Sequence, residues 1–315
     1  MSKRTIIVEK GGLLTTIQDL GRFGSQQYGV VVGGVMDSFS SRVANILVGN
    51  DEREAVIEMT VIGAELKFLF DATIAVCGGG FIPMIDGKPC SMWKTIYVKE
   101  GETLHFKTTG IGVRTYIAVD GGFFAENILG SKSTYLRGGY GGYHGRSLKK
   151  GDVIACKQEN WRVNRRLSLS PTMIPCYQTN EAIRVILGPD SDFFTSEGID
   201  TFLTNQYTVS NEADRMGYRL QGEPITHSKS ANILSDSVTF GTIQVPAEGL
   251  PIVMMADRQT TGGYPRIAHV ITVDLPRLAQ LKHGDDVYFT SVDLEEAQTL
   301  YREREFFCKN DRLAN

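Results

Sequence analysis

The feature that most restricts the fold of this chain is a series of short apolar segments, broken by turns, between Ala55 and Cys156. Each segment has the length of a β-strand, and little helical periodicity separates one from the next. Such spacing favours a β-barrel or β-sandwich over a doubly wound sheet, in which helices alternate with strands. The segments are Val56 to Val61, Glu65 to Phe70, Thr73 to Cys77, Thr95 to Val98, Thr103 to Phe106, Val113 to Val119 and Val153 to Cys156.

A turn signature with glycine in the third position occurs three times, each time before a strand. Its copies are Lys99 to Glu102, Lys149 to Asp152 and Lys282 to Asp285. Glycine adopts backbone conformations that tight turns require, so each copy predicts a turn. The first and last copies suggest two related barrels. We therefore expect an N-terminal domain over residues 1–160, a polar linker over 161–182 and a C-terminal domain over 183–315.

Helices are expected at only a few places. Asp37 is a good N-cap for a helix whose apolar residues recur at helical spacing, and Gly49 is placed to end it. Asp274 is expected to cap a short helix. A C-terminal helix is expected from Asp293 to about Phe307. The apolar face of that last helix comprises Leu294, Ala297, Leu300 and Tyr301.

Two strands lead directly into polar loops that contain similar functional groups. The apolar run Leu250 to Ala256 continues into Asp257 to Tyr264, which holds a carboxylate, a guanidinium, an amide, hydroxyls and a phenol. Near the N-terminus, a strand ending at Ile17 precedes Gln18, Asp19 and Arg22. These loops are candidates for a binding site. The alternative is that they are polar only because loops face water.

Several familiar chemistries are not supported. The segment Gly130 to Thr134 resembles a phosphate-binding loop, but Ser131 separates the glycine from Lys132 and the preceding glycine is missing. A looser anion or nucleotide site remains possible in the glycine-rich run that follows. Its candidate residues are Arg137, Gly138, Gly139, His144 and Arg146. The histidines are far apart, so we expect no metal site.

The composition excludes some partners. Apolar residues make up 42% and charged residues 22% of the chain, and the net charge is -3, so nucleic acid is not an expected partner. No apolar run reaches the roughly 18 residues that span a membrane, and the N-terminus lacks the apolar core of a secretory signal. We expect a cytoplasmic protein. Its 5 cysteines, which form no CxxC pair, are expected to be reduced structural thiols.

Many segments, taken in order, resemble one family. They include TTIQDLGRFGSQQYGV, AVIEMTVIGAEL, GSKSTYLRGGYGGYHGRSLKKGD, VILGPDSDFF, SNEADRMGYRLQG and GTIQVPAEGLPIVMMADRQTTGGYP. The chain resembles the allophanate hydrolase subunit 2 family, also called KipA-like or biotin-dependent carboxyltransferase, and in bacteria the C subunit of 5-oxoprolinase. The resemblance extends from about Val8 to Phe289. It implies a mainly β chain with two cyclophilin-like β-barrel domains and a few short helices.

The resemblance also implies partners and an activity. It implies one component of an enzyme complex whose other components are a KipI-like protein and a LamB/YcsF-like protein. The complex would use ATP to open the lactam of 5-oxoproline to L-glutamate. One alternative is a component of a biotin-dependent carboxyltransferase or allophanate hydrolase-type enzyme acting on urea-like substrates, with biotin carried by another protein. Another is an antagonist of KipI that regulates a sporulation histidine kinase.

These reactions act on a planar amide or ureide, and the polar loops contain groups that can bind one. Amide, hydroxyl and guanidinium groups can form hydrogen bonds with its carbonyl and N–H edges. The candidates for substrate binding are Gln18, Gln244, Gln259, Thr260, Tyr264 and Arg215. The candidates for catalysis are Asp19, Arg22 and Asp257. From the sequence, Asp257→Asn and Arg22→Ala are expected to remove activity with little effect on stability.

Overall fold

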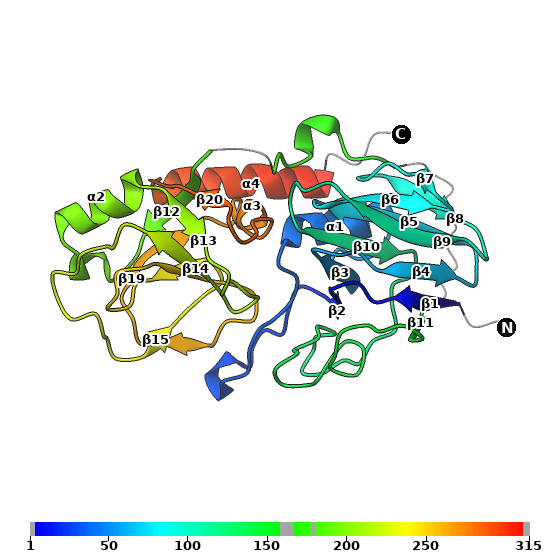
Figure 1. Cartoon of the computed structure of the whole chain (residues 1–315), viewed down its shortest axis with the longest axis horizontal. Coiled ribbons are helices and arrows are strands. Elements are labelled where there is room, and N and C mark those ends of the chain that lie inside the picture. The colour runs from blue at the N-terminus through cyan, green and yellow to red at the C-terminus, as the bar shows by residue number, and fades with distance from the viewer. Residues whose placement is uncertain (1–3, 158–166, 178–180, 311–315) are drawn as a thin grey trace. The chain divides into compact units, whose positions relative to one another are not determined.

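The computed structural model of the chain describes residues 4–157, 167–177 and 181–310 (Figure 1). These residues divide into two units: 4–23, 33–157 and 167–177 form the first, and 24–32 and 181–310 form the second. Much of the predicted linker, residues 161–182, lies outside the described residues. In its described part, Leu167 and Leu169 form backbone hydrogen bonds with Thr95 and Trp93 of the first unit.

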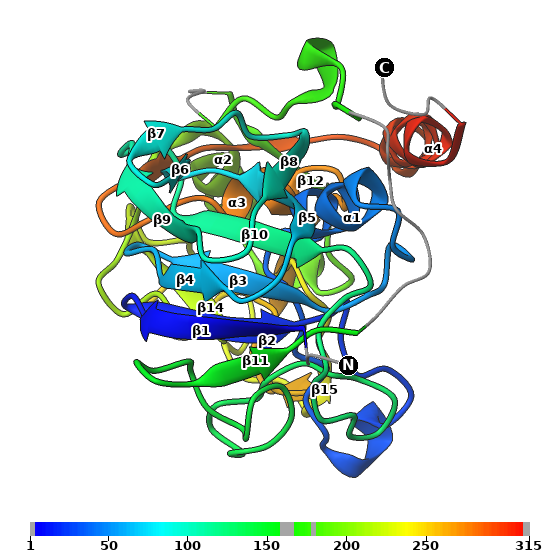
Figure 2. The same cartoon turned by 90° about the vertical axis from the view of Figure 1, so that its right-hand side faces the viewer.

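The strands of the first unit form two antiparallel sheets (Figure 2). The strands are β1 Thr5–Lys10, β2 Leu14–Gln18, β3 Val56–Thr60, β4 Glu65–Phe68, β5 Ala72–Gly78, β6 Phe81–Ile85, β7 Lys88–Pro89, β8 Thr95–Val98, β9 Thr103–Thr108, β10 Arg114–Val119 and β11 Val153–Ala155. One sheet has the order β11-β1-β4-β9-β6-β7 and the other β2-β3-β10-β5-β8. Their apolar side chains form one core, in which Val8, Leu66, Val76 and Ile117 are buried.

The helix of the first unit begins and ends where local signals predict. Helix α1 covers Ser38–Leu47, and the carboxylate of Asp37 accepts hydrogen bonds from the amide (2.9 Å) and hydroxyl (2.6 Å) of Ser40. Gly49 follows with a φ of 77° and donates its amide to Ile46. The predicted N-cap and terminating glycine are therefore confirmed.

The second unit contains an eight-stranded sheet that curls until its two edges almost meet. Its strands are β12 Ile183–Leu187, β13 Tyr207–Val209, β14 Gly217–Gly222, β16 Thr242–Gln244, β17 Ile252–Met254, β19 Arg266–Val270, β20 Asp286–Val287 and β21 Phe289–Ser291. The order β20-β13-β14-β17-β16-β19-β12-β21 places β20 and β21 at opposite edges, although only Tyr288 separates them in the chain. A nearly closed barrel results, and the prediction of a mainly β chain is confirmed.

The three glycine turns share one geometry. In each, the residue after glycine donates its amide to the carbonyl of the lysine, and the glycine has a φ between 84° and 92°. That is the type II arrangement, which requires a positive φ at the third residue. The carboxylates of Glu102, Asp152 and Asp285 accept the amide of the lysine at 2.8, 2.7 and 3.0 Å. The predicted turns are confirmed.

The remaining elements that the structure describes are three helices, two small strands and three 3-10 turns. They are α2 Ser196–Thr204, α3 Leu275–Leu278, α4 Leu294–Asn310, the small strands β15 Asp236–Ser237 and β18 Thr261–Gly262, and the 3-10 turns η1 Gln26–Tyr28, η2 Pro171–Met173 and η3 Ser191–Phe193. In α4, Asp293 caps the amide of Glu296 at 2.7 Å, as predicted. The predicted apolar face is only partly correct, because Ala297 is buried but Leu294 and Tyr301 are exposed. No helix among the described residues is long and apolar enough to cross a membrane.

Candidate functional site

In the first unit, Asp19 joins two loops that are distant in sequence. Its Oδ1 accepts hydrogen bonds from the hydroxyls of Ser131 (2.6 Å) and Ser133 (2.5 Å) and from the amide of Gly21 (2.9 Å). Its Oδ2 accepts the amide of Lys132 at 2.6 Å. Both oxygens are therefore occupied, and the carboxylate holds the loop after β2 against residues 131–133.

The segment Gly130 to Thr134 does not offer its backbone to a phosphate. The amides of Ser131, Lys132, Ser133 and Thr134 donate to Ile128, Asp19, the Ser131 hydroxyl and Ile17. The side chain of Lys132 is paired with Glu54. Because a phosphate cradle needs free N–H groups, this segment does not fit one, in agreement with the departures of its sequence from a P-loop.

Arg22 is fully buried and contacts the same segment. Its Nε donates to the carbonyl of Ile128 (2.8 Å), its Nη2 donates to that of Ser133 (2.9 Å), and its guanidinium lies 4.9 Å from the ring centre of Tyr140. Its Nη1 has no hydrogen-bond partner among the residues that the structure describes. A buried cationic donor without a partner is costly, so this atom is a place where a ligand or water could bind.

Close backbone packing explains part of the glycine-rich run from Gly138 to Gly145. A Cβ at Gly141 would lie 2.1 Å from the carbonyl oxygen of Ser133, and one at Gly145 would lie 2.0 Å from the backbone of Gly139. The amides of Gly139, Gly145 and Arg146 donate to carbonyls within the same loop. Those amides are therefore not free to bind an anion.

The charged residues of this run have separate environments. Arg146 forms a two-point ion pair with Asp152, with distances of 2.7 and 2.8 Å. The hydrogen bond between them lowers the pKa of Asp152 and raises that of Arg146. The side chains of Arg137 and His144 are exposed, as is Gly138. The structure thus brings Gln18, Asp19 and Arg22 to residues 131–142, whereas Arg146 is engaged with Asp152.

In the second unit, Asp257 and Arg215 form a buried ion pair. Arg215 Nε lies 2.9 Å from Asp257 Oδ2, and Nη2 lies 3.0 Å from Oδ1. Pairing of β14 with β17 places the two residues side by side, and the amide of Asp257 donates to the carbonyl of Arg215 at 2.7 Å. Two parallel charge-assisted hydrogen bonds fix both side chains, so this pair orders the loop that begins at Asp257.

Gln244 lies beneath the other end of that loop and is buried. Its Nε2 donates to the carbonyl of Tyr264 at 2.8 Å, and its Oε1 has no partner among the described residues. A Cβ at Gly262 would lie 2.6 Å from both amide atoms of Gln244. The loop therefore needs glycine at residue 262, because the backbone rests directly on the carboxamide.

The remaining predicted residues of this loop are more accessible. Gln259 is exposed, and Tyr264 is 40% exposed. The carbonyl of Thr260 accepts the amide of Val238 at 3.1 Å, which attaches the loop to the segment before β16. Gln259 and Tyr264 therefore lie where a ligand could reach them.

Arg258 supplies the guanidinium of this polar loop but is not among the candidate site residues predicted from the sequence. Its guanidinium donates to the carbonyls of Val238 and Met255, both at 3.3 Å, and the structure gives it no ion-pair partner within residues 4–157, 167–177 and 181–310. Burial lowers its pKa to about 10, which the charge of Asp257 partly opposes. The sequence shows only that Arg258 follows an apolar strand. Its burial could not be predicted, because it depends on a contact with Val238, 20 residues earlier in the chain.

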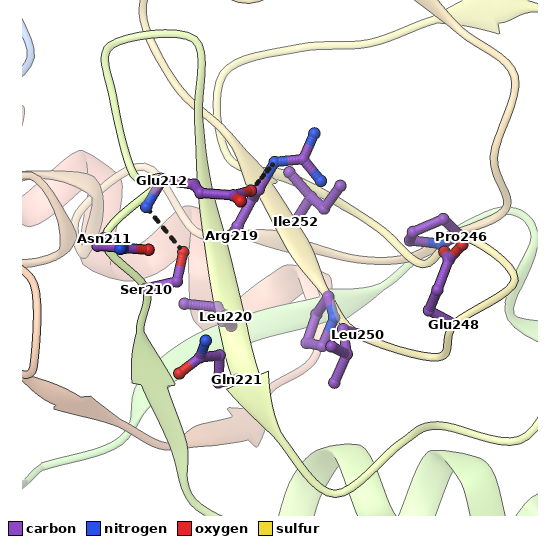
Figure 3. A pocket seen from close by; sticks show the side chains of 11 residues that line it. Ser210, Asn211, Glu212, Arg219, Leu220, Gln221, Pro246, Glu248, Leu250 and Ile252 are labelled. Carbon is purple, nitrogen blue, oxygen red and sulfur yellow. Dashed lines mark hydrogen bonds and ion pairs between the residues drawn. The ribbon is translucent and has the colours of Figure 1, made fainter.

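The second unit also has a cavity of about 260 Å³ that holds none of the predicted residues (Figure 3). It lies along β14 and the segment before β17, and Arg219 and Glu212 form an exposed ion pair of 3.2 Å beside it. Arg22 and Asp257 lie in different units. Among the described residues, no group of acidic, histidine or cysteine side chains could hold a metal ion.

Comparisons with known proteins agree on one family. Residues 28–291 match the carboxyltransferase domain, subdomains A and B. The chain is 37% identical to the C subunit of 5-oxoprolinase from Haemophilus influenzae over 94% of both chains, and 36% identical to that of Escherichia coli over 91% of both. The crystal structure of the K. lactis urea amidolyase matches all of this chain with a TM-score of 0.92 and 29% identity, and the match covers 20% of that longer chain.

Proposed function

Because the chain belongs to the family of the carboxyltransferase domain, subdomains A and B, we propose that it is the C subunit of an ATP-dependent 5-oxoprolinase. Together with a KipI-like and a LamB/YcsF-like partner, it opens the lactam of 5-oxoproline to L-glutamate. The observation that carries this proposal is the match to two bacterial proteins of that name over more than nine tenths of each chain.

In this proposal the chain binds and orients the planar lactam. Carboxamide groups such as Gln18 and Gln244 face the N–H edge of the lactam, and buried guanidinium groups such as Arg22 stabilise charge on its carbonyl oxygen. ATP, when bound to the complex, supplies the activation of that carbonyl. Since the amides of residues 131–134 are engaged within the chain, we assign the binding of ATP to one of the partner proteins.

The test is an assay of the assembled complex. The KipI-like and LamB/YcsF-like partners are purified with and without this chain, and the release of glutamate from 5-oxoproline is measured with ATP. We expect activity only when the chain is present, and we expect its addition to restore activity to the partial complex. Unchanged activity of the two partners without this chain would contradict the proposal.

A second candidate function is carboxyl transfer between a biotin carried by another protein and a urea-like acceptor. The similarity to the urea amidolyase structure over the whole chain favours it. If the chain acts in this way, its activity needs a biotinylated carrier, and avidin abolishes that activity. Full activity in the presence of avidin would rule out this candidate and leave lactam opening.

A further inference from the structure

The same tripeptide ends a strand in each unit, with a buried glutamine as its last residue. Thr16-Ile17-Gln18 ends β2, and Thr242-Ile243-Gln244 forms β16. The exposed fractions of Gln18 and Gln244 are 0% and 1%. Buried glutamine is uncommon unless its amide is fully hydrogen-bonded. Its occurrence at matching positions calls for a physical explanation.

Both glutamines are held in one orientation. Gln18 Nε2 donates to the carbonyl of Thr134 at 3.1 Å, and Gln244 Nε2 donates to that of Tyr264 at 2.8 Å. A carbonyl oxygen only accepts hydrogen bonds. Rotating either carboxamide by half a turn would place its Oε1 against that carbonyl oxygen, with no hydrogen between the two acceptors. Oε1 of each glutamine is therefore fixed as a free acceptor, and neither atom has a partner within the described parts of the chain.

A free acceptor must be matched by a donor. In the first unit the unpaired Nη1 of Arg22 adds a cationic donor, and its Nη2 is held by Ser133, next to the residue that holds Gln18. An acceptor and a donor together match an N–H and a C=O of one planar group. A phosphate has no N–H to offer Gln18, so it fits this pair of atoms less well.

The second unit also offers a buried free acceptor. Gln244 Oε1 is this acceptor, and Gly262 lies so close that an added Cβ would be 2.6 Å from both amide atoms of Gln244. Arg258, in the same loop, donates only to backbone carbonyls and keeps a charge that no described carboxylate neutralises by an ion pair. The free acceptor at Gln244 again calls for a ligand with an N–H group, as a neutral amide or ureide has.

We propose that each unit holds its own binding site for a planar amide or ureide, one centred on Gln18 and the other on Gln244. The choice of ligand class rests on the proposed function, which the inference deepens by assigning two such sites to one chain. A reaction between two amide-containing molecules, or between an amide and a carboxylated ureide, would use both. Neither site requires ATP or another protein.

The test is a titration of the full chain, with its glutamine side-chain amides labelled with ¹⁵N and followed by NMR. The probe is ethyleneurea, a cyclic ureide with N–H groups, and the matched probe is N,N′-dimethylethyleneurea, which has the same ring and carbonyl but no N–H. The signals of Gln18 and Gln244 are identified by their loss in Gln18→Met and Gln244→Met. If Gln18→Met does not fold, Gln18→Glu, which keeps the shape of the side chain, identifies the signal instead.

We expect both signals to shift saturably with ethyleneurea and neither to shift with the dimethyl probe. Gln18→Met should leave the midpoint of the Gln244 signal unchanged, and Gln244→Met should leave that of the Gln18 signal unchanged, because the two sites are separate. The control Gln298→Met, on the exposed face of α4, should change neither midpoint. Sites filled only by water would give no shift with either probe, and this result would overturn the proposal.

Two other results would also overturn it. Equal shifts with the dimethyl probe would show that the N–H donor is not recognised. Loss of both responses in either single variant, with the fold retained, would show one composite site instead of two. Because no partner protein or ATP is present, an inactive complex with intact binding would refute only the proposed function, and an active complex without binding would refute only this inference.

Discussion

Arg215 and Asp257 form a two-point ion pair inside the second unit, with both side chains at most 8% exposed. This burial changes the expectation drawn from the sequence, that Asp257→Asn would leave stability intact. Removing one charge leaves the other buried without a counter-ion, which typically costs about 3–5 kcal/mol. We expect Asp257→Asn to lower the free energy of unfolding by about 3 kcal/mol or more, measured by urea denaturation at neutral pH.

The same unit offers a control for this prediction. Glu212 pairs with Arg219 at 3.2 Å, and their side chains are 70% and 56% exposed. Exposed pairs contribute about 0–1 kcal/mol, so Glu212→Gln should hardly change stability. The double variant Arg215→Met, Asp257→Leu should recover much of the loss, because no unpaired charge remains. Equal effects of Asp257→Asn and Glu212→Gln would show that the buried pair has no special role.

Gly262→Ala should disturb the carboxamide of Gln244. The added methyl group would lie 2.6 Å from both Nε2 and Oε1, so the glutamine must move or the loop must lift. We expect a loss of about 1–3 kcal/mol in stability and a clear loss of activity in the assembled complex. Gly263→Ala is the matched control, since its nearest neighbours lie at 3.6 Å. Similar effects of the two substitutions would contradict a specific contact with Gln244.

His269 should make the stability of the chain depend on pH near neutrality. Its Nδ1 lies 3.1 Å from the hydroxyl of Thr242, and burial, helped by the charge of Arg266, lowers its pKa. The unfolded chain therefore takes up the proton first as the pH falls. Stability is full above the ordinary pKa of about 6.5 and decreases below it, by at most about 1.4 kcal/mol per pH unit, until the folded pKa is passed.

Urea denaturation between pH 8 and pH 5 checks this dependence. His269→Gln should flatten the curve in that range, whereas His105→Gln on β9 controls for the loss of an imidazole elsewhere. An unchanged slope in His269→Gln would assign the effect to other groups.

Thiol labelling should distinguish buried from exposed cysteines. Burial raises the pKa of Cys77 well above its usual value and that of Cys156 to about 12, whereas Cys176 is exposed. In folded protein at pH 8, we expect iodoacetamide to modify Cys176 and to leave Cys77 and Cys156 unmodified, as identified by mass spectrometry. Unfolding in urea should make all of them reactive. Rapid labelling of Cys77 in the folded chain would contradict its burial.

The features predicted correctly from the sequence are those set by neighbouring residues. Asp37 caps the amide of Ser40 three residues later, and each glycine turn closes between a lysine and the acid that follows the glycine. Such contacts need no knowledge of the rest of the fold. The same local reasoning predicts Asp274 as a helix cap, but its carboxylate instead accepts hydrogen bonds from Arg184. The carboxylate of Asp274 thus binds an arginine that is distant in sequence and not the nearby amides of the helix.

The candidate site is harder to predict because its contacts connect residues far apart in the chain. Gln18 finds its acceptor at Thr134, and the buried position of Arg258 depends on Val238. The residue types of both polar loops are recognisable in the sequence, but their pairing is not. From the sequence alone, Arg215 is predicted to bind substrate. Its ion pair with Asp257 becomes apparent only from the register of β14 and β17.

The edges of the eight-stranded sheet have a consequence for how the chain folds during synthesis. The first strand of the second unit, β12, pairs in parallel with β21, and Ile183 lies opposite Phe289. This pairing cannot form until Phe289 has been synthesised. Residues 184–288 are therefore synthesised before β12 can pair with β21. Until then the ribosome-bound chain exposes the unpaired backbone N–H and C=O groups of β12. Chains truncated before Phe289 should therefore aggregate.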